Sequence, residues 1–131
     1  MDAPLGRLTR RPEFLRVTER GRRFAAPGLV LQSLLRPADL PAGSKTGARD
    51  AAEIRLGLTA SRKVGGAVER NRARRRLRAL ARQFLPGHGA PGHDYVLVAR
   101  RDTVTREWAG LVGDLETALR RLGQWHGEAS R

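Results

Sequence analysis

The chain of 131 residues contains no cysteine, a single methionine and few aromatic side chains, which make up 5% of it. Without cysteine, no disulfide can stabilise a small secreted fold. No apolar run is long enough to cross a bilayer, and the N-terminal stretch MDAPLGRLTRRPEF lacks the apolar segment of a signal peptide. We therefore expect one domain over residues 1–131, located in the cytoplasm and without a membrane partner.

The residue types that carry hydrolytic chemistry are scattered rather than grouped. A protein nuclease needs paired carboxylates that hold metal ions, or a histidine that acts as acid and base. The acids form no such pairs, and two of the three histidines lie in the glycine-rich stretch GHGAPGHD. The motifs GxxxxGK(S/T), HExxH and GxSxG are also absent. We expect no catalytic residue, no metal site and no small-molecule substrate, and a protein-only hydrolase is a minor alternative.

Lysine is nearly absent, with only Lys45 and Lys63, whereas arginine is abundant. The base composition of the genome is the simpler explanation of this preference. Whatever the origin of this preference, an arginine-rich helix suits RNA, because guanidinium groups pair with phosphates in bidentate fashion and stack on bases.

Positive charge is plentiful and is concentrated in one segment. The net charge is +13, and residues 62–82 hold nine basic side chains and one acidic side chain. Residues 100–131, in contrast, hold six basic and five acidic side chains. Charge that serves only solubility would be spread over the surface. The local cluster therefore favours a polyanion, and RNA above all, over a merely solvated face.

The first part of the chain predicts a helix followed by two strands. In PEFLRVTER, Phe14, Val17 and Thr18 share one side at helical spacing, while Pro12 suits the first turn and Gly21 the end. The strand-like runs RRFAA and LVLQSLLR follow and are separated by a Pro-Gly turn.

The middle of the chain predicts a βαβ unit after a flexible loop at residues 37–53. IRLGLTAS alternates with period two, so that Ile54 lies on an apolar side and Arg55 on a side of mostly small, polar residues. That second side suits a ligand groove or an ordinary solvent face equally well. The basic segment AVERNRARRRLRALARQFLPG carries an apolar stripe and predicts a helix that begins near Gly66 and ends before Pro86. DYVLVAR is typical of a buried strand.

The last part, TREWAGLVGDLETALRRLG, predicts a helix capped by Thr105. Trp108 is expected to lie in the core, with a platform for base stacking as the alternative. Residues 123–131 are expected to form a loose tail. The predicted order is αβββαβα, with a sheet of four strands and no internal repeat.

The segment LTASRKVGGAVERNRARRRLRAL resembles the signature of the protein subunit of bacterial ribonuclease P, whose central motif is Arg-Asn-Arg on a basic helix. The similarity extends from LTRRPEFLRVTERG through YVLVAR to the last helix. It implies an α+β fold, a small α/β sandwich similar to a domain of ribosomal proteins. It also implies a left-handed crossover between the two parallel strands, against the rule that most βαβ units obey.

The resemblance implies two sets of binding residues. Those that contact the catalytic RNA are Arg62, Lys63, Arg70, Asn71, Arg72, Arg74, Arg75 and Arg78. Those that form a cleft for the 5′ leader of precursor tRNA are Phe14, Thr18, Phe24, Gln32, Thr59 and Ser61. Thr18 and Gln32 replace aromatic residues of many family members, and Phe24 is expected to compensate for them.

The implied function is that of a protein cofactor in an endoribonuclease that removes the leader and gives the mature 5′ end of tRNA. The expected partners are the catalytic RNA and precursor tRNA. Magnesium bound mainly by the RNA would carry the chemistry. A stand-alone RNA-binding or ribosome-associated module is the alternative, because it would need the same basic helix without a cleft.

Overall fold

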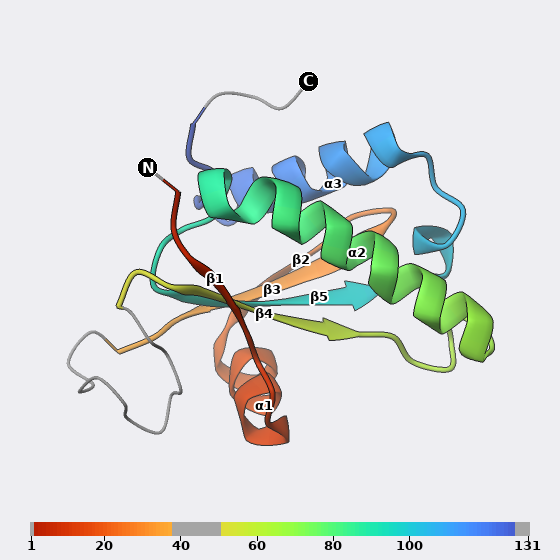
Figure 1. Ribbon diagram of the computed structural model, residues 1–131, viewed down its shortest axis with the longest axis horizontal. Helices are drawn as coiled ribbons and strands as arrows, with labels where there is room; N and C mark the ends of the chain where they lie inside the picture. The colour runs from red at the N-terminus through yellow and green to blue at the C-terminus, as the bar shows by residue number, and fades with distance from the viewer. Residues whose placement is uncertain (1, 38–50, 128–131) are drawn as a thin grey trace.

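A computed structural model describes residues 2–37 and 51–127 and shows three α-helices against one mixed sheet (Figure 1). The elements, in chain order, are β1 (Leu5–Arg7), α1 (Arg11–Arg20), β2 (Arg22–Ala25), β3 (Leu29–Leu35), β4 (Ile54–Thr59), α2 (Ala67–His88), β5 (His93–Ala99), a 3₁₀ turn (Arg101–Thr103) and α3 (Trp108–Arg121). The α+β class and the predicted βαβ unit β4–α2–β5 are confirmed.

The sheet has five strands in the order β1-β4-β5-β3-β2, so the prediction of four strands is wrong. β1 pairs in parallel with β4, which is parallel to β5, while β3 is antiparallel to both β5 and β2. The missed strand β1 has only three residues, Leu-Gly-Arg, too few to show a period of two. It forms because the edge of β4 offers partners: Ile54 donates to the carbonyl of Pro4, and Leu8 to that of Leu56.

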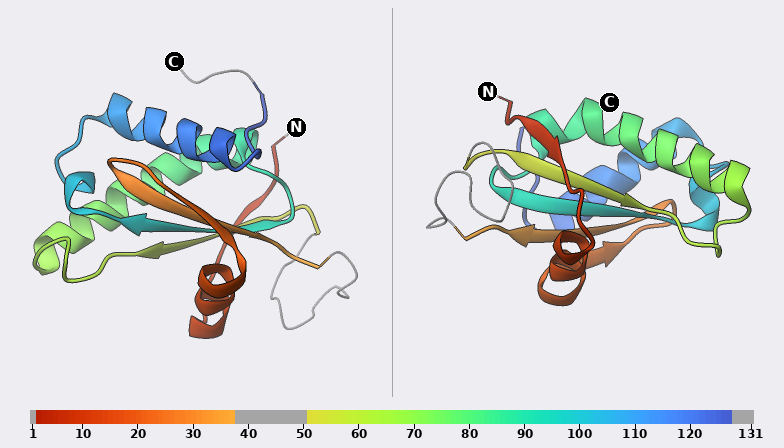
Figure 2. Two further views of the ribbon diagram at one scale, coloured as in Figure 1. Left: turned by 180° about the vertical axis from the view of Figure 1, so that it is seen from behind. Right: turned by 60° about the horizontal axis from the view of Figure 1, so that its bottom comes forward.

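Helices α2 and α3 cover one face of the sheet, and α1 lies on the other (Figures 1 and 2). The main core lies between the sheet and the α2–α3 layer and contains the fully buried Leu31, Leu77 and Leu119. The predicted alternation in β4 is confirmed, because Ile54 and Leu56 point into this core, while Arg55 and Gly57 face α1. Each face of the sheet therefore has its own helical cover.

The helix ends differ in part from the prediction. Helix α2 begins after Gly66, as expected, but continues through Pro86 to His88. Leu85 is fully buried in the core and its carbonyl accepts from the Gly89 N–H, which retains the last turn despite the proline. Helix α3 begins after Glu107.

The prediction that Thr105 caps α3 is wrong. Thr105 donates its N–H to the carbonyl of Asp102 and so extends the 3₁₀ turn instead of capping the helix. Trp108 is then the first helical residue, and it is 37% exposed. The buried stripe of α3 starts only at Leu111, so the prediction of a core tryptophan is wrong.

Two segments were expected to be irregular. Of the predicted loop 37–53, residues 38–50 lie outside the described residues, while Glu53 is buried beside β4. Of the predicted tail 123–131, residues 128–131 likewise lie outside them. The first part of this segment packs against the domain, because Gln124 accepts a hydrogen bond from the Tyr95 hydroxyl at 2.7 Å. The ring of Trp125 stacks on that of His88 with centroids 4.2 Å apart.

Among the described residues, none of the helices combines the length and the apolar character that a membrane span requires.

Candidate nucleic-acid interface

The apolar stripe of α2 determines which of its side chains reach the solvent. Ala73, Leu77, Leu80, Ala81 and Leu85 are fully buried against the sheet. The opposite side is left to arginine, with Arg72, Arg75, Arg78 and Arg82 exposed. An open hollow of about 500 Å³ on this side is lined by Val68, Asn71, Arg74, Arg75 and Arg78. Burial of the stripe therefore brings most residues of the predicted RNA-binding motif onto one surface.

Arg74 is fixed by its neighbours on this surface. It donates to the Asn71 side-chain carbonyl at 3.0 Å and to the backbone carbonyl of Ala60 at 3.5 Å. Asn71 is thereby oriented by the arginine one turn later. Arg70 is half-buried, and Arg62 and Lys63 are exposed in the turn between β4 and α2. The predicted RNA-contacting residues thus lie on α2 and in the turn that leads into it.

Arg76 differs from the other arginines of α2, because it turns inward to the 3₁₀ segment. It donates to the carbonyl of Thr103 at 2.6 Å and also to that of Arg106. Burial, together with the nearby charge of Arg72, lowers the pKa of Arg76. The side chain joins α2 to the approach of α3 and is a structural member of the basic segment. The sequence could not distinguish it from its neighbours.

On the other face of the sheet, α1 places Phe14 directly against Gly57 of β4. A Cβ atom at position 57 would lie 2.4 Å from the Phe14 ring, so only glycine fits below it. Thr18, one turn later, donates its hydroxyl to the side-chain carbonyl of Gln32 at 3.1 Å. The two polar residues that stand in place of aromatic ones are therefore hydrogen-bonded partners.

The other predicted cleft residues are placed differently. Thr59 is half-buried on the same face as Gly57, because the two are separated by one residue on β4. Ser61 is exposed just beyond the end of the strand. Phe24 lies on the opposite face, so the prediction that it compensates in the cleft is wrong.

The register of β2 accounts for the direction of Phe24. Phe24 is the partner of Leu31 in the β2–β3 pair, and Leu31 belongs to the core below α2 and α3. The Phe24 ring packs against that core, and the Arg121 guanidinium lies 5.9 Å from its centre. Arg23, the partner of Gln32, points toward the α1 face instead.

A buried ion cluster that the sequence analysis missed fastens α1 to the sheet. Asp94, fully buried on β5, accepts hydrogen bonds from Arg55 at 2.7 and 2.8 Å, from Arg36 at 2.7 Å and from Arg16 of α1 at 2.9 Å. Arg55 also donates to Glu13 of α1 at 2.8 Å. An arginine between two apolar residues of a strand was the one signal of this cluster in the sequence.

The pKa values in the cluster follow from these contacts. Burial alone would raise the pKa of Asp94, but its hydrogen bonds from Arg55 and Arg36, and their charges, outweigh burial and hold the pKa below its usual value. Burial likewise opposes the charged form of Arg55, yet Asp94 and Glu13 raise its pKa. Both groups are therefore charged at neutral pH, and the cluster orients the helix that carries Phe14.

Within residues 2–37 and 51–127, no group of three or more histidines or acids is placed to hold a metal ion. The most buried carboxylate, that of Asp94, is occupied by guanidinium groups. His88 is stacked between Phe84 and Trp125. The donor set of the described residues does not fit a magnesium ion, and no catalytic step is assigned to one on the protein.

The comparison with known families shows to which family the chain belongs. A sequence model of the family Ribonuclease P matches residues 4–123. The chain belongs to the ribonuclease P protein family. It is similar to the ribonuclease P protein components of Paramagnetospirillum magneticum, at 46% identity over 126 residues (94% of this chain and 86% of that one), and of Caulobacter vibrioides, at 45% over 113 residues (86% and 68%).

Solved structures of ribonuclease P proteins share the fold. The protein from Staphylococcus aureus matches with a TM-score of 0.69 at 21% identity, over 92% of this chain and 97% of that one. The protein from Thermotoga maritima matches with a TM-score of 0.62 at 22% identity, over 83% and 90%. The predicted family membership is confirmed. As a ribonuclease P protein, the chain is the protein subunit of an endoribonuclease and assists processing of the 5′ leader of precursor tRNA.

Proposed function

We propose that this ribonuclease P protein binds the catalytic RNA with α2 and the 5′ leader of precursor tRNA with the sheet face below α1. The observation that carries the proposal is the separation of the two surfaces. The exposed arginines belong to a helix on one face of the sheet, while Phe14 and Gly57 meet on the other. One protein can therefore contact two RNA elements at once.

The surface proposed for the catalytic RNA consists of Arg62, Lys63, Arg70, Asn71, Arg72, Arg74, Arg75 and Arg78. Its guanidinium groups neutralise phosphates that a folded RNA packs closely together. Arg74 bonds Asn71 and thereby presents that side chain in a fixed orientation. Since each phosphate contact releases condensed counterions, we expect the affinity to fall steeply with salt.

The surface proposed for the leader consists of Phe14, Thr18, Gln32, Thr59 and Ser61. Phe14 offers an aromatic face on which a base can stack, and such stacking tolerates every base. The exposed Thr18, hydrogen-bonded to the buried Gln32, supplies a polar floor in place of further aromatic rings. A surface of this kind holds a single strand with little sequence readout, as leaders of many sequences require.

The protein contributes charge and position, and the cleavage chemistry belongs to the RNA. Magnesium bound mainly by the catalytic RNA polarises the scissile phosphate and activates water. The role requires no small-molecule substrate and no membrane, and we assign it to the cytoplasm. We also propose that the β4–α2–β5 crossover is left-handed, as the family resemblance implies. The parallel pairing of β4 and β5 around α2 is compatible with this hand.

Reconstitution tests the proposal. The purified chain, added to a bacterial ribonuclease P RNA at low magnesium, should stimulate leader removal and should bind precursor tRNA with a leader more tightly than mature tRNA. A stand-alone RNA-binding module would bind both tRNA forms equally and would not stimulate cleavage. Metal-dependent cleavage by the chain without added RNA would instead support a protein-only hydrolase.

A further inference from the structure

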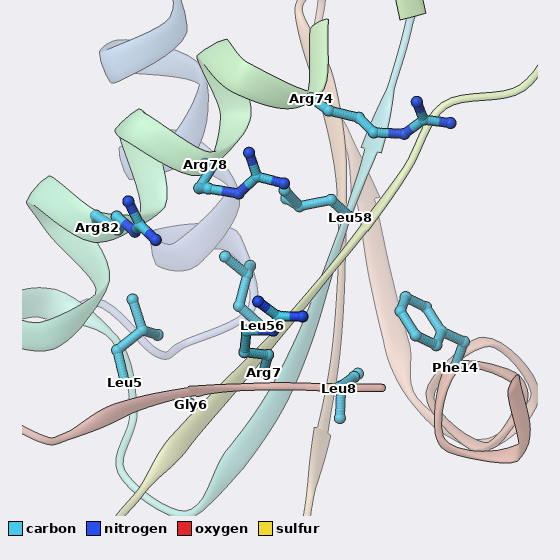
Figure 3. Close-up of a pocket in the computed structure, with 10 residues that line it drawn as sticks. All are labelled: Leu5, Gly6, Arg7, Leu8, Phe14, Leu56, Leu58, Arg74, Arg78 and Arg82. Carbon is cyan, nitrogen blue, oxygen red and sulfur yellow. The ribbon is translucent and has the colours of Figure 1, made fainter. Parts of the chain in front are cut away.

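A groove lies where β4 extends beyond its partner β1. The pairing of β1 with β4 ends with Arg7 opposite Leu56, and β4 continues through Leu58 to Thr59. The hollow left between β1, β4 and α2 has a volume of about 270 Å³. Figure 3 shows Phe14 of α1 at one end of it and Arg82 of α2 at the other. The groove therefore connects the α1 face with the basic helix around the edge of the sheet.

Among the residues that the structure describes, four arginines and no acidic side chain line this groove. Arg74, Arg78 and Arg82 follow one another at four-residue steps and form one row on α2. Arg7 faces them from β1, because its register partner Leu56 points toward α2 (Figure 3).

Three of these arginines have no partner among the described residues. Arg7, Arg78 and Arg82 are exposed, and within the part of the chain that the structure describes they form neither a hydrogen bond nor an ion pair. Like charges gathered around one hollow repel each other unless an anion lies between them. The arginines of the groove thus do not stabilise the fold, and we expect them to bind an anionic ligand.

The floor of the groove indicates the form of that ligand. Leu5, Leu56 and Leu58 form an apolar base between the two charged rims. The volume is near the lower end of small-ligand sites, so it admits a nucleotide but not a duplex. A folded RNA helix would instead contact the open outer side of α2. Apolar surface below a row of cations suits single-stranded RNA, whose bases stack or pack while its phosphates pair with arginine.

We infer that Arg7 and Arg82 bind backbone phosphates of the 5′ leader beyond the nucleotides that lie at Phe14. The leader then leaves the α1 face at Phe14, passes the uncovered edge of β4 and reaches α2. This inference rests on the proposed function, since it extends the path of the same leader. It adds two residues that lie outside both surfaces described above.

The test uses the holoenzyme reconstituted with a bacterial ribonuclease P RNA. Precursor tRNAs are prepared with leaders lengthened one nucleotide at a time, and their dissociation constants are measured for the wild type and for Arg7→Ala/Arg82→Ala. Arg121→Ala/Arg120→Ala is the control, because it removes the same charge from α3, which lies above β2 and β3 away from β1. Arg7→Lys/Arg82→Lys retains the charge but not the guanidinium fork.

We expect the Ala variant to bind short-leader precursors like the wild type and to lose affinity by about tenfold once the leader is long enough to reach the groove. The salt dependence of the long-leader complex should become shallower by about one to two units in log–log slope. The Lys variant should recover part of the loss, and the control should show no dependence on leader length. Affinity for the catalytic RNA should not change.

Two results would overturn the inference. One is a loss of precursor affinity that is equal at every leader length, or a loss of affinity for the catalytic RNA. Either loss would assign the groove to the catalytic RNA. The other is unchanged binding of all precursors, which would show that the arginines are only solvated. A wild-type chain that fails to stimulate cleavage would instead contradict the proposed function, so the two failures are distinguishable.

Discussion

Arg55 and Asp94 are partners on the adjacent strands β4 and β5, and the guanidinium contacts the carboxylate at two points on the sheet face that α1 covers. Arg55 Nε donates to Oδ1 at 2.8 Å and Nη2 donates to Oδ2 at 2.7 Å. Both side chains are almost completely buried. The remaining Nη1 group of Arg55 holds Glu13, so one arginine joins two strands and a helix.

Removal of the Asp94 charge should therefore destabilise the protein strongly. In Asp94→Asn, three arginines lose their common acceptor, and we expect unfolding to become easier by about 3–5 kcal/mol, the range for breaking a buried ion pair. Urea denaturation measures this effect. Glu19→Gln, an exposed change on α1, is the matched control and should stay close to the wild type. Equal stability of the two variants would contradict the structural role of the cluster.

Acid should weaken the same cluster. The pKa of Asp94 lies below its unfolded value, so its contribution to stability is complete above about pH 4, the ordinary carboxylate range, and is lost as the pH falls through the folded pKa. We expect the free energy of unfolding to drop with falling pH in that acid window. The Asp94→Asn variant should show a shallower drop in urea titrations between neutral and acid pH. An identical drop in both proteins would exclude Asp94 as the source.

Gly57→Ala should disturb the position of Phe14. The new Cβ would lie 2.4 Å from the ring, which must move, and we expect a loss of about 1–3 kcal/mol of stability from this overpacking. Binding of leader-bearing precursor should weaken while binding of catalytic RNA is retained. In the double variant with Phe14→Ala, the clash is absent, so the two changes should not be additive. Additive losses in binding and stability would show that the contact does not position the ring.

Arg75 and Arg76 are adjacent in sequence but should respond oppositely to truncation. Arg75→Ala should leave thermal stability within about 0.5 kcal/mol of the wild type, as exposed sites do, and should weaken assembly with the catalytic RNA. Arg70→Ala is expected to weaken assembly as well. Arg76→Ala should lower stability, because the carbonyls of Thr103 and Arg106 lose their donor. Thermal melts and RNA titrations of each variant measure the two effects. A loss of stability in Arg75→Ala, or unchanged stability in Arg76→Ala, would contradict this assignment.

Local patterns in the sequence predicted most of the fold. The alternation of β4 and the apolar stripe of α2 are visible because each residue repeats the period of its own element. β1 was missed because three residues carry no period, and its pairing depends on a strand some fifty residues later. The cap of α3 was misplaced because the 3₁₀ turn competes for Thr105. Elements defined by distant partners are thus the ones that sequence patterns do not show.

In the candidate site, too, features with a local period were visible in the sequence, and features that depend on distant residues were not. The apolar stripe of α2 is visible in the sequence and leaves most arginines of the helix exposed. Arg76, in contrast, depends on carbonyls beyond β5 that no local pattern indicates. The direction of Phe24 depends on the register of β2 with β3, and a shift of one residue would reverse it. The Asp94 cluster joins α1, β4, β5 and Arg36, which follows β3, so it exists only in three dimensions.

The central claim is that two separate surfaces of one protein contact two different RNAs. Its most direct test measures Arg75→Ala and Phe14→Ala in both assays, namely assembly with the catalytic RNA and binding of leader-bearing precursor by the assembled holoenzyme. We predict that Arg75→Ala mainly weakens assembly and that Phe14→Ala mainly weakens precursor binding. Equal effects of both changes in both assays would contradict the account.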